Sequence, residues 1–294
     1  MARAAGYELI WEDFAALSAV VPLLARVYPN GAADVNQFQA AGGPGWLIRE
    51  LLGAGLLHGD VPTVAGEGLA AYCREPWLEE GRLAWRDLPE QSPAEDIVRP
   101  AAAPFAQESG LQLLSGNLGR AMVKTSAVDP AYWQVRAPAR VFDSEAAVHQ
   151  AYAAGLLQGD LVLVVRFQGP RANGMPELHK LMPLLVNLQR NGQRVALVTD
   201  GRLSGASGQV LAALHLTPEA AAGGVLARVQ EGDWINVDAL SGRLELEVSE
   251  AELATRQPVR LPEELAAGFG LGLFATQRRL VGPADQGATT LEWE

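Results

Sequence analysis

The spacing of apolar side chains differs between the first third of the chain and the remainder. Residues 9–28 carry apolar positions at helical spacing, and residues 46–52 form a short amphipathic pattern. Residues 64–72 predict a further helix. Residues 74–108 show little periodicity and carry scattered prolines, which indicates a linker with extended pieces.

Beyond this linker, short apolar runs alternate with helical stretches. Residues 161–167 and 195–199 are apolar and rich in β-branched side chains, so each predicts a strand buried on both faces. Asp143-Ser-Glu145 predicts the start of a helix over 145–154, and Pro176 suits the first turn of a helix through Leu188. Further strands are predicted at 112–114, 122–124, 140–142, 223–229, 234–237 and 244–248.

These patterns together predict an α/β fold. We expect a mostly helical segment over 1–95, a linker over 96–111 and a β-rich domain over 112–294. Many short strands with a few helices and frequent Gly-Asp turns favour a compact barrel with helices packed outside it.

The charge balance argues against two classes of partner. The chain of 294 residues has a net charge of −11, and its lysines are Lys124 and Lys180. An acidic chain without a basic run does not suit nucleic acid or an anionic membrane surface. It has no apolar run long enough for a membrane span, and its N-terminus lacks the apolar core of a signal peptide. We therefore expect a soluble, cytoplasmic protein.

Cysteine and histidine usage narrows the chemistry further. Cys73 is the single cysteine, so the chain alone can form neither an internal disulfide nor a multi-cysteine zinc or iron–sulfur site. His58, His149 and His215 show no triad-like or metal-ligand spacing. Isolated histidines of this kind favour structural roles.

Two loops follow the two strongest predicted strands. The first is Gly169-Pro-Arg-Ala-Asn-Gly-Met-Pro-Glu-Leu-His-Lys180, and the second runs from Asp200 to Gly208 with glycines at 201, 205 and 208. Both follow buried strands, so we expect them to open on the same rim of the barrel, where sites are usually placed. A glycine-rich loop with hydroxyls can bring backbone N–H groups and a side-chain oxygen close to a ligand.

The residues of these loops leave several interpretations open. Glu177 could simply complement the dipole of a helix beginning at Pro176, or it could be a ligand of Mg²⁺. Ser204 could act as a nucleophile or base only if something stabilises its alkoxide. The glycines of the second loop could serve an ordinary turn, since the loop matches neither phosphate-loop pattern.

The same two loops closely resemble the two C-terminal signatures of the dihydroxy-acid dehydratase and 6-phosphogluconate dehydratase family. Flanking segments resemble the phosphogluconate branch: Ser115-Gly-Asn-Leu-Gly-Arg120, Gly223-Gly-Val-Leu-Ala-Arg-Val229, Gln286-Gly-Ala-Thr289 and Val21-Pro-Leu-Leu-Ala-Arg-Val-Tyr-Pro-Asn-Gly31. Family members are longer, and their cluster cysteines lie in an N-terminal half. The resemblance therefore implies a C-terminal half only, comprising the tail of the N-terminal domain, a linker and a swivelling barrel-like domain.

The resemblance also implies an activity and its cofactors. It implies a hydro-lyase that dehydrates 6-phosphogluconate to 2-dehydro-3-deoxy-6-phosphogluconate in the Entner–Doudoroff pathway. An iron–sulfur cluster, expected to be 4Fe–4S, would be bound outside this chain and act as Lewis acid on the C3 hydroxyl. Mg²⁺ would hold the carboxylate end of the substrate. The chain alone is expected to be inactive, and the family usually forms dimers or tetramers.

By the same resemblance, residues of the two loops take specific roles. Ser204 matches the alkoxide base of the family, and Glu177 matches the one Mg²⁺ ligand that the C-terminal domain provides. The expected substrate-binding residues are Arg171, Lys180, Asp200 and Arg202, with the three cations as candidates for the substrate phosphate. A dehydratase for a non-phosphorylated aldonic or dihydroxy acid and a non-catalytic binding module remain as alternatives.

Overall fold

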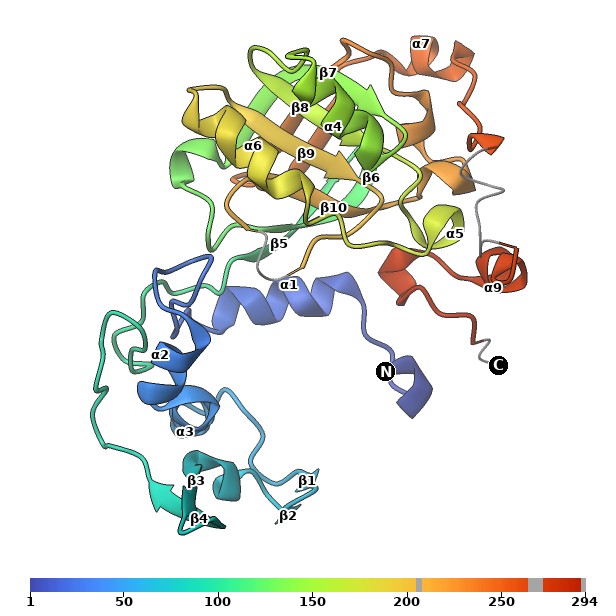
Figure 1. The fold of residues 1–294 in the computed structure, drawn as a ribbon. Helices are drawn as coiled ribbons and strands as arrows, with labels where there is room; N and C mark the ends of the chain where they lie inside the picture. Colours follow the sequence, from blue (N-terminus) through green and yellow to red (C-terminus); the bar gives the residue numbers. More distant parts are fainter. Residues whose placement is uncertain (205–207, 264–271, 292–294) are drawn as a thin grey trace. The chain divides into compact units, whose positions relative to one another are not determined.

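A computed structural model describes residues 1–204, 208–263 and 272–291. The chain divides into two compact units (Figure 1). Unit 1 combines Met1–Ala16 with Leu111–Glu294, and unit 2 is Leu17–Gly110. The expected linker at 96–111 remains a prediction.

A closed barrel dominates unit 1. In the described part of the chain its eight strands follow the order β10-β6-β5-β12-β11-β7-β8-β9, and β9 pairs with β10 to close the ring. The strands are β5 (Leu111–Gly116), β6 (Gly119–Lys124), β7 (Gln134–Phe142), β8 (Leu161–Val165), β9 (Val195–Thr199), β10 (Leu211–Thr217), β11 (Trp234–Asp238) and β12 (Arg243–Leu246). This arrangement confirms the predicted α/β fold with a β-rich barrel.

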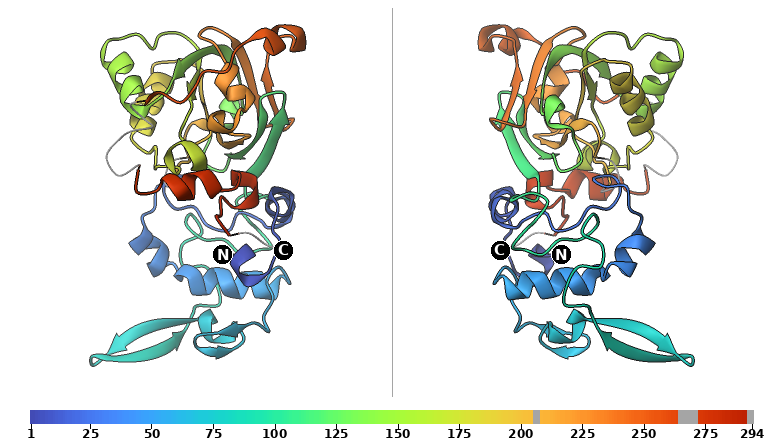
Figure 2. Two further views of the ribbon diagram at one scale, coloured as in Figure 1. Left: turned by 90° about the vertical axis from the view of Figure 1, so that its right-hand side faces the viewer. Right: turned by 90° about the vertical axis from the view of Figure 1, so that its left-hand side faces the viewer.

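Strands β7 to β10 form a continuous parallel part of the barrel, and β12 also pairs with β5 in parallel. Parallel neighbours need a crossover, and helices α4 (Glu145–Ala153) and α6 (Leu181–Arg190) provide two of them. Both helices cover the same outer side of the barrel (Figures 1 and 2). Ser144 caps α4 by accepting a hydrogen bond from the N–H of Ala147, as its sequence predicted.

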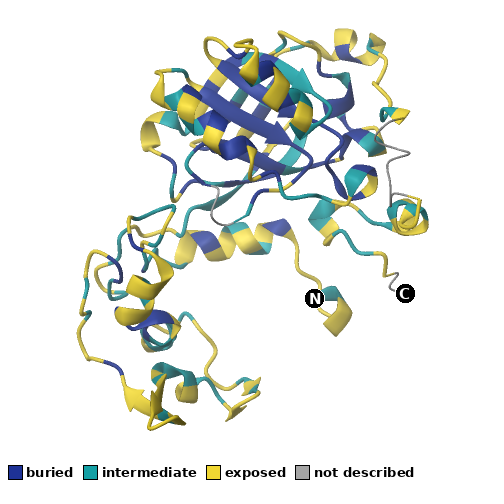
Figure 3. Cartoon of the chain, in the orientation of Figure 1, coloured by how far each residue is buried: buried dark blue, intermediate teal, exposed yellow. Residues whose placement is uncertain are grey.

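Alternation along these strands separates two apolar clusters. On β8, Val162 and Val164 point into the barrel interior, whereas Leu161 and Leu163 pack outward beneath the helices. The side chains facing inward are mostly alanine and valine, because a small barrel leaves room only for compact side chains. Strands β8 and β9 are thus buried on both faces and apolar at almost every position (Figure 3).

The remaining elements of unit 1 are short. They are η1 (Arg3–Ala5), η3 (Pro130–Tyr132), α5 (Pro170–Asn173), η4 (Ala220–Ala222), η5 (Val225–Arg228), α7 (Glu250–Thr255), α9 (Ala275–Leu280) and η6 (Ala284–Gln286). Helix α1 (Trp11–Val20) runs across the boundary between the two units. None of the helices in the described ranges is both long and apolar enough to cross a membrane.

Unit 2 has a smaller core, and hairpins extend from it. Its helices are α2 (Val35–Ala40) and α3 (Gly43–Gly53), and Trp46 of α3 is buried among Ala33, Ala41, Leu88, Ile97 and Val98. The other elements are β1 (Pro62–Thr63), β2 (Gly66–Glu67), η2 (Ala70–Cys73), β3 (Arg74–Glu79) and β4 (Arg82–Asp87). Strands β3 and β4 form an antiparallel hairpin.

Three local predictions are wrong. Residues 64–72 do not form a helix but contain the β1–β2 hairpin and η2, because Gly66 and Gly68 adopt left-handed backbone angles that break a helix. Residues 223–229 form the short helix η5 rather than a strand. Pro176 does not begin a helix, since the chain leaves α5 at the left-handed Gly174 and enters α6 only at Leu181.

Candidate functional site

The two signature loops lie at the same edge of the barrel. Strands β8 and β9 are parallel and in register from Leu161 opposite Val195 to Val165 opposite Thr199. The segments that follow them, the β8 loop (residues 166–180) and the β9 loop (residues 200–210), therefore leave from the same end of the sheet, as predicted. Residues 205–207 of the β9 loop, including Ser207, lie outside the described residues.

The two loops are joined to each other by backbone and side chain. Glu177 and Arg202 form a parallel bridge, and the N–H of Leu178 donates to the carbonyl of Arg202 at 3.2 Å. The guanidinium of Arg202 adds a hydrogen bond from Nε to the carbonyl of Met175 at 2.8 Å. The β8 loop thus adds an extended segment beside the β9 loop.

Glu177 lies at the centre of this connection. Its Oε2 accepts a hydrogen bond from Nη1 of Arg202 at 2.8 Å, and its Oε1 accepts one from the backbone N–H of Ser204 at 2.8 Å. Because Glu177 is in an extended segment and not in a first helical turn, a helix dipole does not explain its charge. Its carboxylate holds Ser204 in place and remains partly exposed at the rim.

Ser204 is held from its other side by a residue that the sequence did not single out. Nζ of Lys124, at the end of β6, donates to the backbone carbonyl of Ser204 at 2.7 Å. Burial lowers the pKa of Lys124, while the charge of Glu177 raises it. The N–H and the C=O of Ser204 therefore both bind charged side chains. This fixes the backbone that carries its hydroxyl.

The electrostatic surroundings of Ser204 contain more positive than negative charge. Lys124 and Arg202 are cations and Glu177 is an anion. Burial lowers the pKa of His215, and the positive charges of Lys124 and Arg202 lower it further. A neutral His215 leaves the two cations to act against a single carboxylate. Surroundings of this sign favour the charged form of an acidic group such as a hydroxyl.

Asp200 lies behind the loops and not at their exposed surface. Its side chain is fully buried, with Oδ1 accepting from the N–H of Gln168 at 2.8 Å. Its Oδ2 accepts from the N–H groups of Phe167 at 3.2 Å and Ala220 at 3.0 Å. Burial raises the pKa of Asp200 to about 6, and these three hydrogen bonds oppose that rise. Asp200 thus anchors the β8 loop and the turn after β10 to the β9 strand.

A second buried carboxylate supports the same corner. Glu219 accepts hydrogen bonds from the N–H groups of Arg171 at 2.8 Å and Ala172 at 3.1 Å, which are the first donors of α5. Burial raises the pKa of Glu219, and the two hydrogen bonds and the charge of Arg171 lower it. A side chain at Gly169 would collide with this carboxylate, with a Cβ only 2.3 Å from its oxygen, so the position requires glycine.

Two backbone positions in the β8 loop are strained. Phe167 and Met175 have φ angles of 62° and 56°, in the left-handed region that is costly for residues with a side chain. Such residues concentrate where the surrounding structure imposes a conformation for function. In the loop, they flank α5 and place Glu177 beside the β9 loop.

The predicted site residues therefore separate into three groups. Glu177, Arg202 and Ser204 lie together at the rim, with Lys124 added by the structure. Asp200 is buried beneath them. Arg171 and Lys180 are exposed, Arg171 on α5 and Lys180 as the residue before α6, and neither forms an ion pair with a described residue.

The described residues do not by themselves form a metal centre. No group of three or more histidine, cysteine or acidic side chains in the described ranges is arranged to bind an ion. Glu177 is a single carboxylate, and hydrogen bonds already engage both of its oxygens. Cys73 lies in unit 2, where burial raises the pKa of its thiol. A Mg²⁺ ion or an iron–sulfur cluster would need most of its ligands from elsewhere.

Comparison with known proteins assigns the chain to a family. Residues 96–288 match the model of the dihydroxy-acid/6-phosphogluconate dehydratase C-terminal domain, and residues 1–72 match the model of the N-terminal domain of the same family. The chain belongs to this dehydratase family. The match confirms the resemblance carried by the two loops, and the rim residues Glu177 and Ser204 lie within the C-terminal domain.

Individual dehydratases of the family differ in their similarity to the chain. Phosphogluconate dehydratase of Pseudomonas aeruginosa is 56% identical over 98% of this chain and 47% of its own length. The enzyme of the same name from Escherichia coli K12 is 55% identical over 99% of this chain and 48% of its own length. Dihydroxy-acid dehydratase of Acaryochloris marina is 37% identical over 99% of this chain and 49% of its own length. The chain spans about half the length of these relatives.

Proposed function

We propose that the chain is the C-terminal portion of a hydro-lyase that dehydrates 6-phosphogluconate to 2-dehydro-3-deoxy-6-phosphogluconate. The observation that carries this proposal is the 56% identity to a phosphogluconate dehydratase across nearly the whole chain, against 37% to a dihydroxy-acid dehydratase. The position of Ser204 and Glu177 at one rim supports it, because a dehydration needs a base beside a charged substrate group.

In this proposal Ser204 is the base. Its alkoxide takes the proton from C2 of the substrate, and the C3 hydroxyl leaves as hydroxide, which takes that proton back from the Ser204 hydroxyl to form water. The resulting enol tautomerises to the 2-keto product. The cations Lys124 and Arg202 stabilise the alkoxide, and the two backbone hydrogen bonds of Ser204 keep it oriented. Lys124 is a positioning residue here, since it acts through Ser204.

The cofactors and the remaining ligands belong to the proposal as well. We propose that Glu177 is the one carboxylate that this chain offers to Mg²⁺, and that an iron–sulfur cluster, expected to be 4Fe–4S, is ligated outside the chain. A single cysteine, Cys73, cannot hold such a cluster. The ligands would come from an N-terminal half, within a homo-oligomer, and the isolated chain is expected to be inactive.

We assign the substrate contacts to the predicted residues whose side chains are exposed to solvent. Arg171, Lys180 and Arg202 present guanidinium or ammonium groups at the edge of the barrel and suit a phosphate or a carboxylate. Asp200 accepts three backbone hydrogen bonds while fully buried, so we assign it to anchoring the loops that carry these residues.

The test is reconstitution. The chain is mixed with the cysteine-bearing N-terminal half of a phosphogluconate dehydratase in the presence of iron and sulfide, and formation of the keto product from 6-phosphogluconate is followed. We expect turnover in the mixture and none from the chain alone. Turnover of gluconate in preference to 6-phosphogluconate would instead favour a dehydratase of non-phosphorylated acids, and failure of the halves to associate would favour a non-catalytic module.

The role of Ser204 is tested in the same mixture. Ser204→Ala should lower kcat by at least about 100-fold, the usual contribution of a positioned base, with little effect on stability. Ser126→Ala is the matched control, since Ser126 is exposed in the same unit. Equal activity of the Ser204→Ala and Ser126→Ala variants would remove Ser204 from the mechanism.

A further inference from the structure

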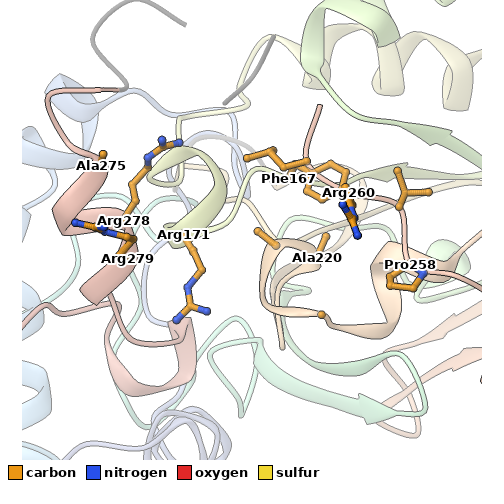
Figure 4. Close-up of a pocket in the computed structure, with 12 residues that line it drawn as sticks. Phe167, Arg171, Ala220, Pro258, Arg260, Ala275, Arg278 and Arg279 are labelled. Atoms are coloured by element: carbon orange, nitrogen blue, oxygen red, sulfur yellow. The ribbon is translucent and has the colours of Figure 1, made fainter. Parts of the chain in front are cut away.

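A cavity lies next to Asp200, since two of its lining residues, Phe167 and Ala220, donate backbone hydrogen bonds to that carboxylate. It has a volume of about 710 Å³ and is lined by residues of the β8 loop, the turn after β10, the segment 258–261 and helix α9. Figure 4 shows Arg171, Arg278 and Arg279 on one side and Arg260 with Phe167 on the other. A cavity of this size accommodates a small metabolite rather than a bare ion.

Among the residues that the structure describes, every charged side chain that lines this cavity is an arginine. The chain as a whole carries a net charge of −11, so a cavity whose described lining holds four arginines and no carboxylate differs in sign from the rest of the chain. Arg171, Arg260, Arg278 and Arg279 form no ion pair with any residue that the structure describes. A set of unpaired guanidinium groups around a cavity focuses a positive potential inside it.

The hydrogen bonds around the cavity leave donors available. Arg278 donates from Nη1 to the carbonyl of Ala172 at 3.0 Å, which attaches α9 to α5, but its buried Nε has no partner among the described residues. A buried donor without an acceptor is costly, so this corner of the fold is not fully satisfied by the described residues. The first N–H groups of α5 are already bound by Glu219, so a ligand here would be held by side chains.

Glu219 is a carboxylate beside this corner, where it accepts hydrogen bonds from the N–H groups of Arg171 and Ala172. Its carboxylate lies behind α5, is itself 6% exposed and does not line the cavity. This carboxylate offsets part of the charge of Arg171. Within the described residues, no carboxylate lines the cavity beside Arg260, Arg278 and Arg279, so the described lining is cationic.

We propose that this cavity binds the phosphate group of a phosphorylated metabolite, with Arg171, Arg260, Arg278 and Arg279 as its ligands. Guanidinium groups bind phosphate oxygens through paired N–H donors, and the apolar wall with Phe167 accommodates a carbon chain. Phosphate binding itself follows from the cavity. Identifying the ligand as the substrate's own phosphate end rests on the proposed function, and a separate phosphorylated molecule would have the same chemistry.

The cavity is connected to the rim through the β8 loop and through Asp200. Arg171 lies on the β8 loop that also carries Glu177, and the N–H of Ala220, which lines the cavity, donates to Asp200. Binding in the cavity would therefore contact the same loop that holds Ser204 through Glu177.

Calorimetric titration of the chain at low ionic strength tests the site directly. Inorganic phosphate, 6-phosphogluconate and gluconate are the probes. We expect both phosphate-containing probes to bind, gluconate not to bind, and the double variant Arg171→Gln/Arg279→Gln to weaken phosphate binding by about ten-fold or more. Both arginines are exposed, so the variant should melt at the wild-type temperature.

The control is Arg190→Gln/Arg243→Gln. It removes two exposed arginines from the same unit, away from the cavity lining. Wild-type affinity for phosphate in this control supports the site. An equal loss in both double variants, equal binding of gluconate, or no binding of phosphate by the wild type would overturn the proposal.

The reconstituted mixture separates the two sources of the phosphate. A KM for 6-phosphogluconate that rises in Arg171→Gln/Arg279→Gln supports the substrate's phosphate end as the occupant. Loss of phosphate binding with an unchanged KM supports a separate phosphorylated molecule. The titration on the chain alone measures binding and needs no turnover. Its result can therefore be interpreted even if the proposed enzymatic function is wrong.

Discussion

The barrel of unit 1 and the hairpin of unit 2 bury their side chains to very different degrees. Every residue of β8 and β9 is buried, whereas β3 and β4 expose Leu78 by 72% and Leu83 by 65%. Apolar area removed from water is the main source of folding stability, so the barrel strands should contribute far more of it per residue.

The two regions also use carboxylates differently. In the barrel, the buried Asp200 binds three backbone N–H groups from segments distant in sequence. In the hairpin, Glu75 binds Arg86 on the neighbouring strand at the surface, directly opposite it in the register. The ion pair between Glu75 and Arg86 links two strands that backbone hydrogen bonds already join. In contrast, Asp200 joins the start of the β8 loop and the turn after β10 to the end of β9, which are not consecutive in sequence.

The first prediction compares the same substitution in both regions. Leu197 of β9 is fully buried beneath α6, and Leu197→Ala should lower the free energy of unfolding by about 3–5 kcal/mol. Leu83→Ala should change it by no more than about 0.5 kcal/mol, because its side chain is already in water. Urea unfolding followed by circular dichroism measures both. Similar losses in the two variants would mean that the hairpin is covered in solution.

The same contrast explains how much of the fold the sequence could predict. Strands β8 and β9 were found because burial on both faces produces an uninterrupted apolar run, and the cap of α4 was found at Ser144. The β1–β2 hairpin of unit 2 was taken for a helix because exposed strands carry no such run. Where an element is not buried in the fold, its sequence carries only a weak hydrophobic pattern, and its secondary structure is hard to predict.

The site was predictable only in part, for a related reason. The β8 and β9 loops were found because each follows a clear strand, and their facing edges follow from parallel pairing. Lys124 and the anchoring role of Asp200 were missed. Lys124 contacts Ser204 although 80 residues of sequence separate them, and the local pattern of β6 does not predict that contact. Asp200 looks like a turn residue until three distant N–H groups are seen to converge on it.

The second prediction concerns the pH dependence of the barrel. The pKa of Asp200 is raised by burial from 3.8 to about 6, so between pH 4 and 6 the folded protein keeps a proton that the unfolded chain has released. This group should therefore make the free energy of unfolding fall as pH rises through that window, by about 3 kcal/mol, and contribute no slope above pH 6.

Asp200→Asn tests this pH dependence because asparagine resembles the protonated acid and lacks the titration. Urea unfolding at intervals from pH 4 to 7 should show a shallower decline in the variant than in the wild type. Asp87→Asn on the hairpin of unit 2 controls for the loss of one negative charge. An identical pH profile of the wild type and Asp200→Asn would show that Asp200 is not titrating in the folded barrel.

The third and smallest effect concerns the ion pairs themselves. Glu177→Gln removes the negative charge and one of the two oxygens that accept from Arg202 and from the N–H of Ser204, and should cost about 1 kcal/mol of local stability. The amide of Ser204 should then exchange its hydrogen about five-fold faster, since about 1 kcal/mol corresponds to that change in the open population. Hydrogen exchange followed by mass spectrometry resolves this at the peptide level.

Glu75→Gln provides the matched substitution in the hairpin. Glu75 and Arg86 lie opposite each other on strands that β3–β4 backbone hydrogen bonds already connect, so exchange across this hairpin should stay close to that of the wild type. Acceleration at Ser204 without a matching change at residues 74–87 would show that Glu177 connects elements and does not merely pair at a surface. Equal acceleration in both regions would reduce Glu177 to an ordinary surface ion pair and weaken its proposed role in positioning Ser204.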